Sequence, residues 1–267
     1  MTDLHEELLG IADRLETFGR AADDLEAKSS LDQLEKQATA VGKAWSGSWL
    51  GYHARVYYEG LNPPPAGAHF SQEWGMQESW PIRDTTGIWQ EFVAEDVETV
   101  IRERAGNPDL SRAEEVAEAA RNALESEKGD ALSLFATAVS EEPDAFLSAI
   151  QEQVEKTVAL SKAQILRRWE PAGQVMSRDS LAFTQGFKVA PHLSILADVE
   201  ALRQAPAACL RLCLLARKAG SHLARKARRA KRSQEIGTNV FIGHGRSPLW
   251  RELKDFIQDR LNCKRPV

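Results

Sequence analysis

The residues with the clearest chemical potential form a short glycine turn, Gly243-His244-Gly245-Arg246-Ser247. Two glycines let a ligand approach the backbone without interference from a Cβ atom. Arg246 can donate charge-assisted hydrogen bonds to a phosphate, and His244 can donate to a ribose or phosphate. Ser247 suits a helix N-cap, where free N–H groups and a partial positive charge favour an anion. These five residues are our predicted nucleotide-binding residues.

The segments on either side of this turn match what is needed to position it. Asn239-Val240-Phe241-Ile242 is a short, apolar, β-branched run that fits a buried parallel strand. After Pro248, apolar residues recur at helical spacing as far as Leu261. Strand, glycine turn and helix are the opening unit of an α/β nucleotide-binding domain. Spacing alone is a weak signal, because Pro248 occupies the place of the third glycine in G-x-G-x-x-G and no P-loop motif occurs.

The segment NVFIGHGRSPLWRELKDFIQDRL, residues 239–261, resembles the first strand and helix of the bacterial TIR-like predicted nucleotide-binding domain. This is the effector domain of anti-phage Pycsar and related systems. The segments WSGSWLGYHARVYYEG and NPPPAG also resemble the N-terminal halves of proteins that carry the domain. The resemblance implies a flavodoxin-like α/β domain that binds NAD as its substrate. In active members it implies a hydrolase, an NAD nucleosidase that releases nicotinamide, with no metal.

The sequence departs from that family after the first helix. A TIR-type fold is a doubly wound parallel sheet whose catalytic glutamate lies well downstream, whereas this sequence ends at Val267. A single parallel strand leaves its backbone groups without partners. We therefore expect residues 236–267 to be an incomplete, truncated TIR-like domain that is inactive by itself. The catalytic acid stays unknown, and Glu252 on the first helix is not assigned to that role.

A second candidate site is a basic helix at residues 221–234. Residues 1–160 carry a formal charge of −18 and residues 161–267 one of +13, which together give the net −5. The basic excess is densest in ARKARRAKRSQ, whose cations are Arg225, Lys226, Arg228, Arg229, Lys231 and Arg232. Such asymmetry indicates a nucleic-acid or phosphate partner, or docking of one half of the chain on the other. A solvated helix that serves as a linker is the alternative.

The rest of residues 1–235 is predicted to be mostly helical. Leu4, Leu8, Ile11, Leu15, Phe18, Ala22 and Leu25 lie on one helical stripe, which can enter a core or form a coiled-coil homo-oligomer. Ser30 and Gln33 fit a capping box for a second helix that ends near Trp45. Further helices are expected at 86–106, 111–129 (with a Ser111–Glu114 capping box), 131–139, 143–169 and 194–219, with a kink or break at Pro206 and a loop at 171–192.

Residues 45–85 are irregular and rich in aromatic and proline residues. Five of the seven tryptophans and all three tyrosines lie between residues 45 and 89, around Pro63-Pro64-Pro65. Clustered aromatics beside His53, Arg55 and His69 can stack on a base or another ligand. Alternatively, a long irregular segment over a helical core needs large side chains to hold it in place, and we favour this structural interpretation.

Composition excludes several classes of protein. The chain is 43% hydrophobic and has no apolar run long enough for a membrane span, and MTDLHEELLG lacks the basic start of a secretory signal. Cys209 and Cys213 are four residues apart in an apolar run, so we expect them to pack in the core rather than bind a metal. Sparse cysteines fit a reducing cytoplasm.

We therefore expect a mainly α protein with an incomplete C-terminal TIR-like unit. Its expected function is that of a nucleotide-binding effector of bacterial anti-phage defence, with NAD hydrolysis in the intact family. The alternative is a non-enzymatic helical adaptor or nucleic-acid-binding module that uses the basic helix. Expected partners are a nucleotide, a second copy of the chain and nucleic acid, with no membrane.

Overall fold

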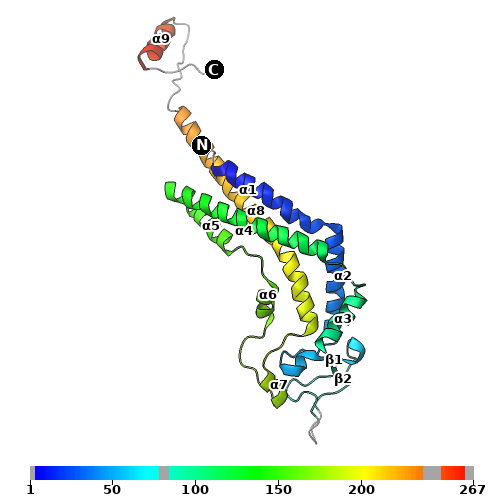
Figure 1. The fold of residues 1–267 in the computed structure, drawn as a ribbon. Coiled ribbons are helices and arrows are strands. Elements are labelled where there is room, and N and C mark those ends of the chain that lie inside the picture. Colours follow the sequence, from blue (N-terminus) through cyan, green and yellow to red (C-terminus); the bar gives the residue numbers. More distant parts are fainter. Residues whose placement is uncertain (1–3, 78–83, 237–247, 262–267) are drawn as a thin grey trace.

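The computed structural model describes residues 4–77, 84–236 and 248–261 and confirms a mainly helical chain (Figure 1). The α-helices are α1 (Leu4–Arg20), α2 (Leu25–Gly42), α3 (Ala94–Arg104), α4 (Ser111–Glu141), α5 (Ala145–Lys156), α6 (Lys162–Trp169), α7 (Ser180–Gln185), α8 (Pro191–Ile236) and α9 (Leu249–Leu261). Short 3₁₀ turns are η1 (Ala21–Asp23), η2 (Gly51–Arg55) and η3 (Glu59–Leu61). Strands β1 (Val56–Tyr58) and β2 (Trp89–Glu91) pair antiparallel, with Tyr57 opposite Gln90.

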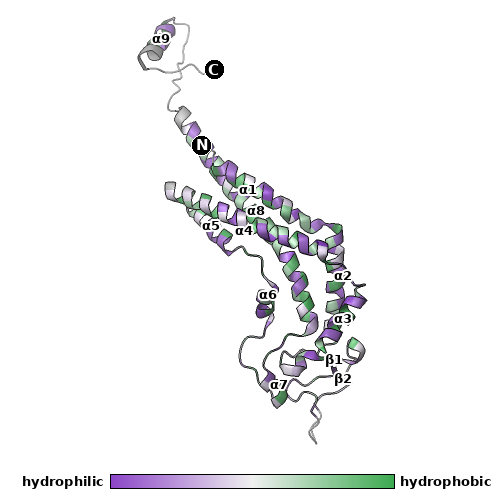
Figure 2. Cartoon of the chain, viewed as in Figure 1, coloured by the Kyte–Doolittle hydropathy of each residue, from purple (hydrophilic) through white to green (hydrophobic). Residues whose placement is uncertain are grey.

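Helix α8 is the spine of the molecule. Its 46 residues span about 69 Å, and α1, α2 and α4 pack along it (Figure 1). Pro206 lies within this helix, so of the predicted alternatives, a kink or a break, the break does not occur. Figure 2 shows hydrophobic and hydrophilic residues together along α1, α4 and α8, as expected for helices that bury one face.

The largest core lies where α1, α4 and α8 meet. Leu8, Ile11 and Leu15 of α1 are buried against α8 and α4, where Phe135 is also fully buried. Helices α1 and α8 approach closely at Gly220, where a Cβ atom would lie 3.0 Å from Leu9 Cγ. The predicted stripe therefore enters the core of its own chain, with the exceptions of Ala22, which is exposed, and Leu25, which is 83% exposed.

The junction between the first two helices differs from the prediction. Helix α1 ends at Arg20, and α2 begins at Leu25 with Asp24 as its N-cap, whose carboxylate accepts from the Glu26 and Ala27 amides. Ser30 lies inside α2, so the predicted capping box of Ser30 and Gln33 is wrong. The Asp24 carboxylate accepts hydrogen bonds from the free amides of the first turn, six residues before Ser30. The helix then continues through Ser29 and Ser30.

The predicted helix at 86–106 is half right. Residues 89–91 form β2, and only Ala94–Arg104 are helical. Pairing with β1 gives Trp89 an aromatic contact, because its ring centroid lies 5.4 Å from that of Tyr58. Cross-strand packing of this kind overrides the apolar spacing that suggested a longer helix.

Helix α4 is longer than predicted. It runs as one helix of 31 residues through Gly129, so the expected end there and the separate helix at 131–139 are wrong. Burial of Ala131 and Phe135 against the core outweighs the low helix propensity of one glycine. The capping box of Ser111 and Glu114 is also absent, because the Ser111 hydroxyl donates to Asp109 (2.7 Å).

The helix predicted at 143–169 is two helices. Asp144 caps α5 as its position suggests, but α5 ends at Lys156. Lys128 Nζ donates to the Glu155 and Thr157 carbonyl oxygens at 2.8 Å each, which satisfies the C-terminal end of α5. A capping box of Ser161 and Gln164 then starts α6, which ends at Trp169 before Pro171. The predicted loop at 171–192 contains the short helix α7.

Candidate polyanion-binding site

The basic helix is the predicted site that the structure describes. Residues 221–234 form the last part of α8, which extends past the ends of α1 and α4 (Figure 1). Of its six cations, all are exposed except Lys226, which is half-buried. Arg225, Arg228, Arg229, Lys231 and Arg232 make no ion pair or side-chain hydrogen bond with any residue in the described part of the chain.

Helical geometry gathers the arginines on one face. Arg225, Arg228, Arg229 and Arg232 are related by steps of three, four and seven residues, which places them in one stripe about 10 Å long. We call these four residues the arginine stripe. Ala227 and Ala230 lie on the opposite side of the helix, and the helix periodicity places Ala224 and Lys231 between the two sides.

The arginine stripe is electrostatically unfavourable by itself. Neighbouring like charges at these spacings destabilise a helix by about 0.2–0.5 kcal/mol per pair, less at high salt. Four such pairs occur within the stripe. A polyanion that neutralises the guanidinium groups would remove this repulsion and add charge-assisted hydrogen bonds, since arginine matches phosphate geometry.

Lys226 attaches α8 to the start of α5 and is not part of the exposed basic surface. Its ammonium lies 2.9 Å from Glu142 Oε2 and 3.3 Å from Asp144 Oδ2, and His222 Nε2 lies 2.8 Å from the same Asp144 oxygen. The hydrogen bond from His222 is the main reason that the pKa of Asp144 falls to about 2. These contacts fix the start of the basic segment to the N-terminus of α5. Lys226 is therefore the one predicted polyanion-binding residue that the fold already uses.

The predicted nucleotide-binding turn lies outside the described residues. Gly243, His244, Gly245, Arg246 and Ser247, and the strand expected at 239–242, fall between α8 and α9. The helix predicted after the turn is present as α9, and it begins at Leu249. Its Leu249, Leu253 and Phe256 side chains are 65%, 50% and 58% exposed.

A buried polar cluster that the sequence did not reveal ties two distant segments together. Asp179 Oδ2 accepts from the Tyr52 hydroxyl (2.6 Å) and lies 3.0 Å from His53 Nε2. Ser48 Oγ lies 3.4 Å from His53 Nδ1, which completes a serine–histidine–aspartate arrangement. Asp179 also caps α7 by accepting from the Leu181 and Ala182 amides.

This cluster is sealed, which favours a structural role over nucleophilic catalysis. His53 and Asp179 are fully buried and Ser48 is 2% exposed. Gly75 covers them so closely that a Cβ atom there would lie 2.4 Å from Asp179 Oδ2. Burial lowers the pKa of His53 below its ordinary value, although Asp179 raises it in part. Burial alone would raise the pKa of Asp179, but hydrogen bonds from Tyr52, His53 and the α7 amides lower it overall.

The aromatic segment packs mainly as a core. Tyr57 is fully buried, and Tyr52 and Phe70 are nearly so. The Tyr57 hydroxyl lies 2.9 Å from His192 Nδ1, and the His192 ring lies 5.1 Å from that of Trp45. Burial lowers the pKa of His192 to about 4. These contacts support the structural interpretation of residues 45–85, in which aromatic side chains hold an irregular segment against the start of α8.

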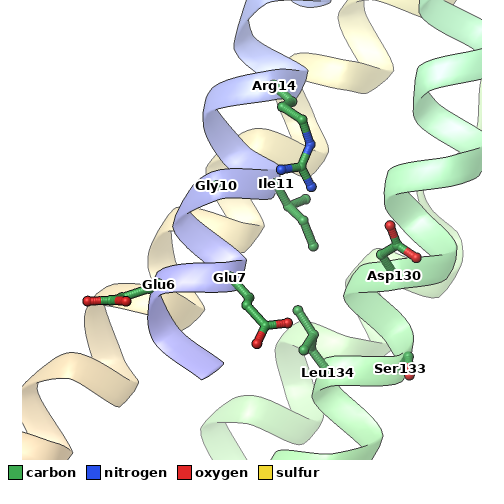
Figure 3. A pocket seen from close by; sticks show the side chains of 8 residues that line it. All are labelled: Glu6, Glu7, Gly10, Ile11, Arg14, Asp130, Ser133 and Leu134. Atoms are coloured by element: carbon green, nitrogen blue, oxygen red, sulfur yellow. The ribbon is translucent and has the colours of Figure 1, made fainter. Parts of the chain in front are cut away.

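A cavity of about 480 Å³ opens between α1 and α4 (Figure 3). Its lining includes Glu7, Ile11 and Arg14 of α1, which point toward α4, whereas Glu6 points away from it. Arg14 is already paired with Glu127 through two hydrogen bonds of 2.6 and 2.7 Å. The cavity therefore offers carboxylates without a free cation or nucleophile, and we assign no chemistry to it.

The described residues contain no cluster suited to a metal ion. Cys209 is fully buried and its thiol donates to the Ala120 carbonyl oxygen (3.2 Å), while burial raises its pKa to about 11. Cys213 is 3% exposed in the same core, so the predicted core packing of both cysteines is confirmed. Within the described helices, none has the length and apolar character needed to cross a membrane.

Comparison of the chain with protein-family models, curated proteins and solved structures found no match. The described geometry is therefore the main support for any function.

Proposed function

We propose that this chain binds a polyanion, with nucleic acid as the principal class, through the arginine stripe of α8. The observation that carries this proposal is the set of four exposed arginines on one helix face that have no acidic partner in the described structure. The helices of the acidic half, residues 1–160, offer many carboxylates, yet of the six cations they form ion pairs only with Lys226. The arginine stripe is therefore exposed, and the carboxylates of the acidic half do not neutralise its charge.

The arrangement predicts the type of recognition. Arginine contacts to phosphate position a protein on nucleic acid but read no sequence directly. Such binding releases condensed counterions and therefore weakens steeply with salt. We expect moderate affinity, little sequence preference and a helix that lies along the backbone or in a groove.

Fluorescence anisotropy with a labelled DNA or RNA duplex tests the proposal. The double substitution R228E/R229E reverses two central charges of the stripe and should abolish binding at low salt. The matched control is K226Q/H222Q, which alters the same helix at its anchored positions and should retain most of the affinity. Equal binding by the charge-reversed protein and the wild type would refute the proposal.

A second candidate function is nucleotide binding by the turn at 243–247 as part of a TIR-like effector of anti-phage defence. The observation that favours it is α9, the helix that the motif requires directly after the turn. NAD is the nucleotide implied by the resemblance, and Arg246 and Ser247 would contact its phosphates. In this proposal the helical region acts as a sensing or oligomerising part, and NAD hydrolysis belongs to an intact domain.

Two measurements test this second candidate. Isothermal titration of the chain with NAD should show binding that R246Q weakens, while R260Q, near the C-terminal end of α9, leaves it unchanged. A nicotinamide-release assay on the same protein measures NAD hydrolysis separately from NAD binding. Absence of NAD binding would sink the nucleotide proposal without affecting the arginine stripe.

A further inference from the structure

A cleft of about 430 Å³ lies where α3, α4 and the linker between α5 and α6 face α8. Its floor is apolar and half-buried, and it includes Leu110, Leu160 and Leu202. Its charged lining includes Arg102 of α3 and Arg121 of α4. A concave site with an apolar floor and a few convergent polar groups is the usual form of a small-molecule site.

The two arginines are exceptional for the acidic half of the chain. Seven arginines are described between residues 4 and 160, and five of them have carboxylate or carbonyl partners: Arg14, Arg20, Arg55, Arg104 and Arg112. Arg102 and Arg121 are the two described arginines of this half without such a partner, and both line the same cleft. Glu114 and Asp198 line the same cleft, yet neither forms an ion pair with Arg102 or Arg121.

The remaining charges define the preferred ligand. Lys162, the first residue of α6, is neutralised by Asp198 of α8 at 2.8 Å. Glu114 is exposed at the rim and opposes one positive charge. The cleft therefore keeps a net positive charge, supplied by two guanidinium groups that can bind an oxyanion in planar, paired fashion.

We propose that this cleft binds a small organic anion, with its carboxylate or phosphate head between Arg102 and Arg121 and its apolar body on the leucine floor. The site is separate from the arginine stripe, because the stripe lies at the other end of α8. It does not depend on the polyanion proposal.

Ligand-observed NMR with phenyl phosphate, benzoate and inorganic phosphate tests the site. At least one of the two aromatic anions should bind saturably, and more tightly than inorganic phosphate, because only the aromatic probes cover the apolar floor. Comparison of phenyl phosphate with benzoate distinguishes a phosphate head from a carboxylate head. If inorganic phosphate bound as tightly as both aromatic anions, the proposed contact between the ligand's apolar body and the leucine floor would be wrong.

Substitutions locate the binding. R102Q/R121Q should lower the affinity for the aromatic anion about tenfold or more, because two charge-assisted hydrogen bonds are lost. Arg121 is exposed, so R121Q alone keeps the fold and should give part of the same loss. The matched control R167Q/R168Q removes two exposed arginines of α6 that do not line the cleft and should leave binding unchanged. No saturable binding by either aromatic anion, or equal weakening in the control, would overturn the proposal.

Discussion

At the scale of single residues, the molecule depends on a few buried polar groups in its least regular part. His53, Asp179 and Tyr52 connect residues 45–60 to α7, and His192 connects the same segment to α8. No local sequence pattern places Asp179 beside His53, because 126 residues separate them. The aromatic content could be read from the sequence, but its polar partners depend on tertiary packing.

His192 should make the stability of the fold depend on pH. Its folded-state pKa of about 4 lies below the usual value of 6.5, so the unfolded chain binds the proton first. The free energy of unfolding should fall as pH drops below about 6.5 and level off near 4, a loss of about 3 kcal/mol from this group. Urea unfolding at several pH values measures this loss. H192Q should remove this part of the loss, whereas His53, whose pKa burial also lowers, keeps its own contribution and the exposed H69Q leaves the loss in place.

Gly75 should tolerate substitution much less than other turn glycines. At Gly75 (φ 63°) a Cβ atom would meet Asp179, His53 and Tyr52 within 2.5 Å, whereas at Gly67 (φ 90°) nothing lies within 4 Å. Thermal unfolding should show that G75A costs at least about 3 kcal/mol, from backbone strain plus overpacking. G67A should cost about 1–2 kcal/mol from strain alone. Equal losses would mean that the buried cluster is not sealed as described.

At the scale of elements, helix existence could be predicted better than helix ends. Apolar spacing correctly indicated α1, α2, α4, α5 and α8. Two of the errors arose where another group supplied the cap: Asp24 in place of Ser30, and Lys128 at the end of α5. Lys128 lies on another helix, so no local signal marked that end, whereas Asp24 was readable as an N-cap.

The boundary between α1 and α2 can be tested by two alanine substitutions. D24A removes the observed N-cap and the ion pair with Arg112, and should lower the free energy of unfolding by about 1 kcal/mol. S30A changes a residue inside α2 and should be neutral or slightly stabilising, because alanine is the better helix former. Denaturant titration of both variants decides between the caps. A larger loss for S30A would favour the sequence-based boundary.

At the scale of the whole molecule, charge segregation is the property that links sequence to function. The acidic and basic halves and the basic helix that continues past Gly220 could be read directly from the sequence, but the continuity of α8 through Pro206 required the structure. The structure shows that the acidic half binds α8 through buried apolar contacts and through ion pairs of Arg203, Arg217 and Lys226, and does not cover the arginine stripe. The predicted homo-oligomer stays a prediction, since the α1 stripe is used within one chain.

The salt dependence of duplex binding is the most direct test of the arginine stripe. If four arginines each displace one condensed counterion, the logarithm of the association constant should fall against the logarithm of salt concentration with a slope of about −3.6. R229Q should reduce the magnitude of that slope by about 1 and weaken binding similarly for all sequences. A slope near zero, or one that R229Q leaves unchanged, would contradict the account.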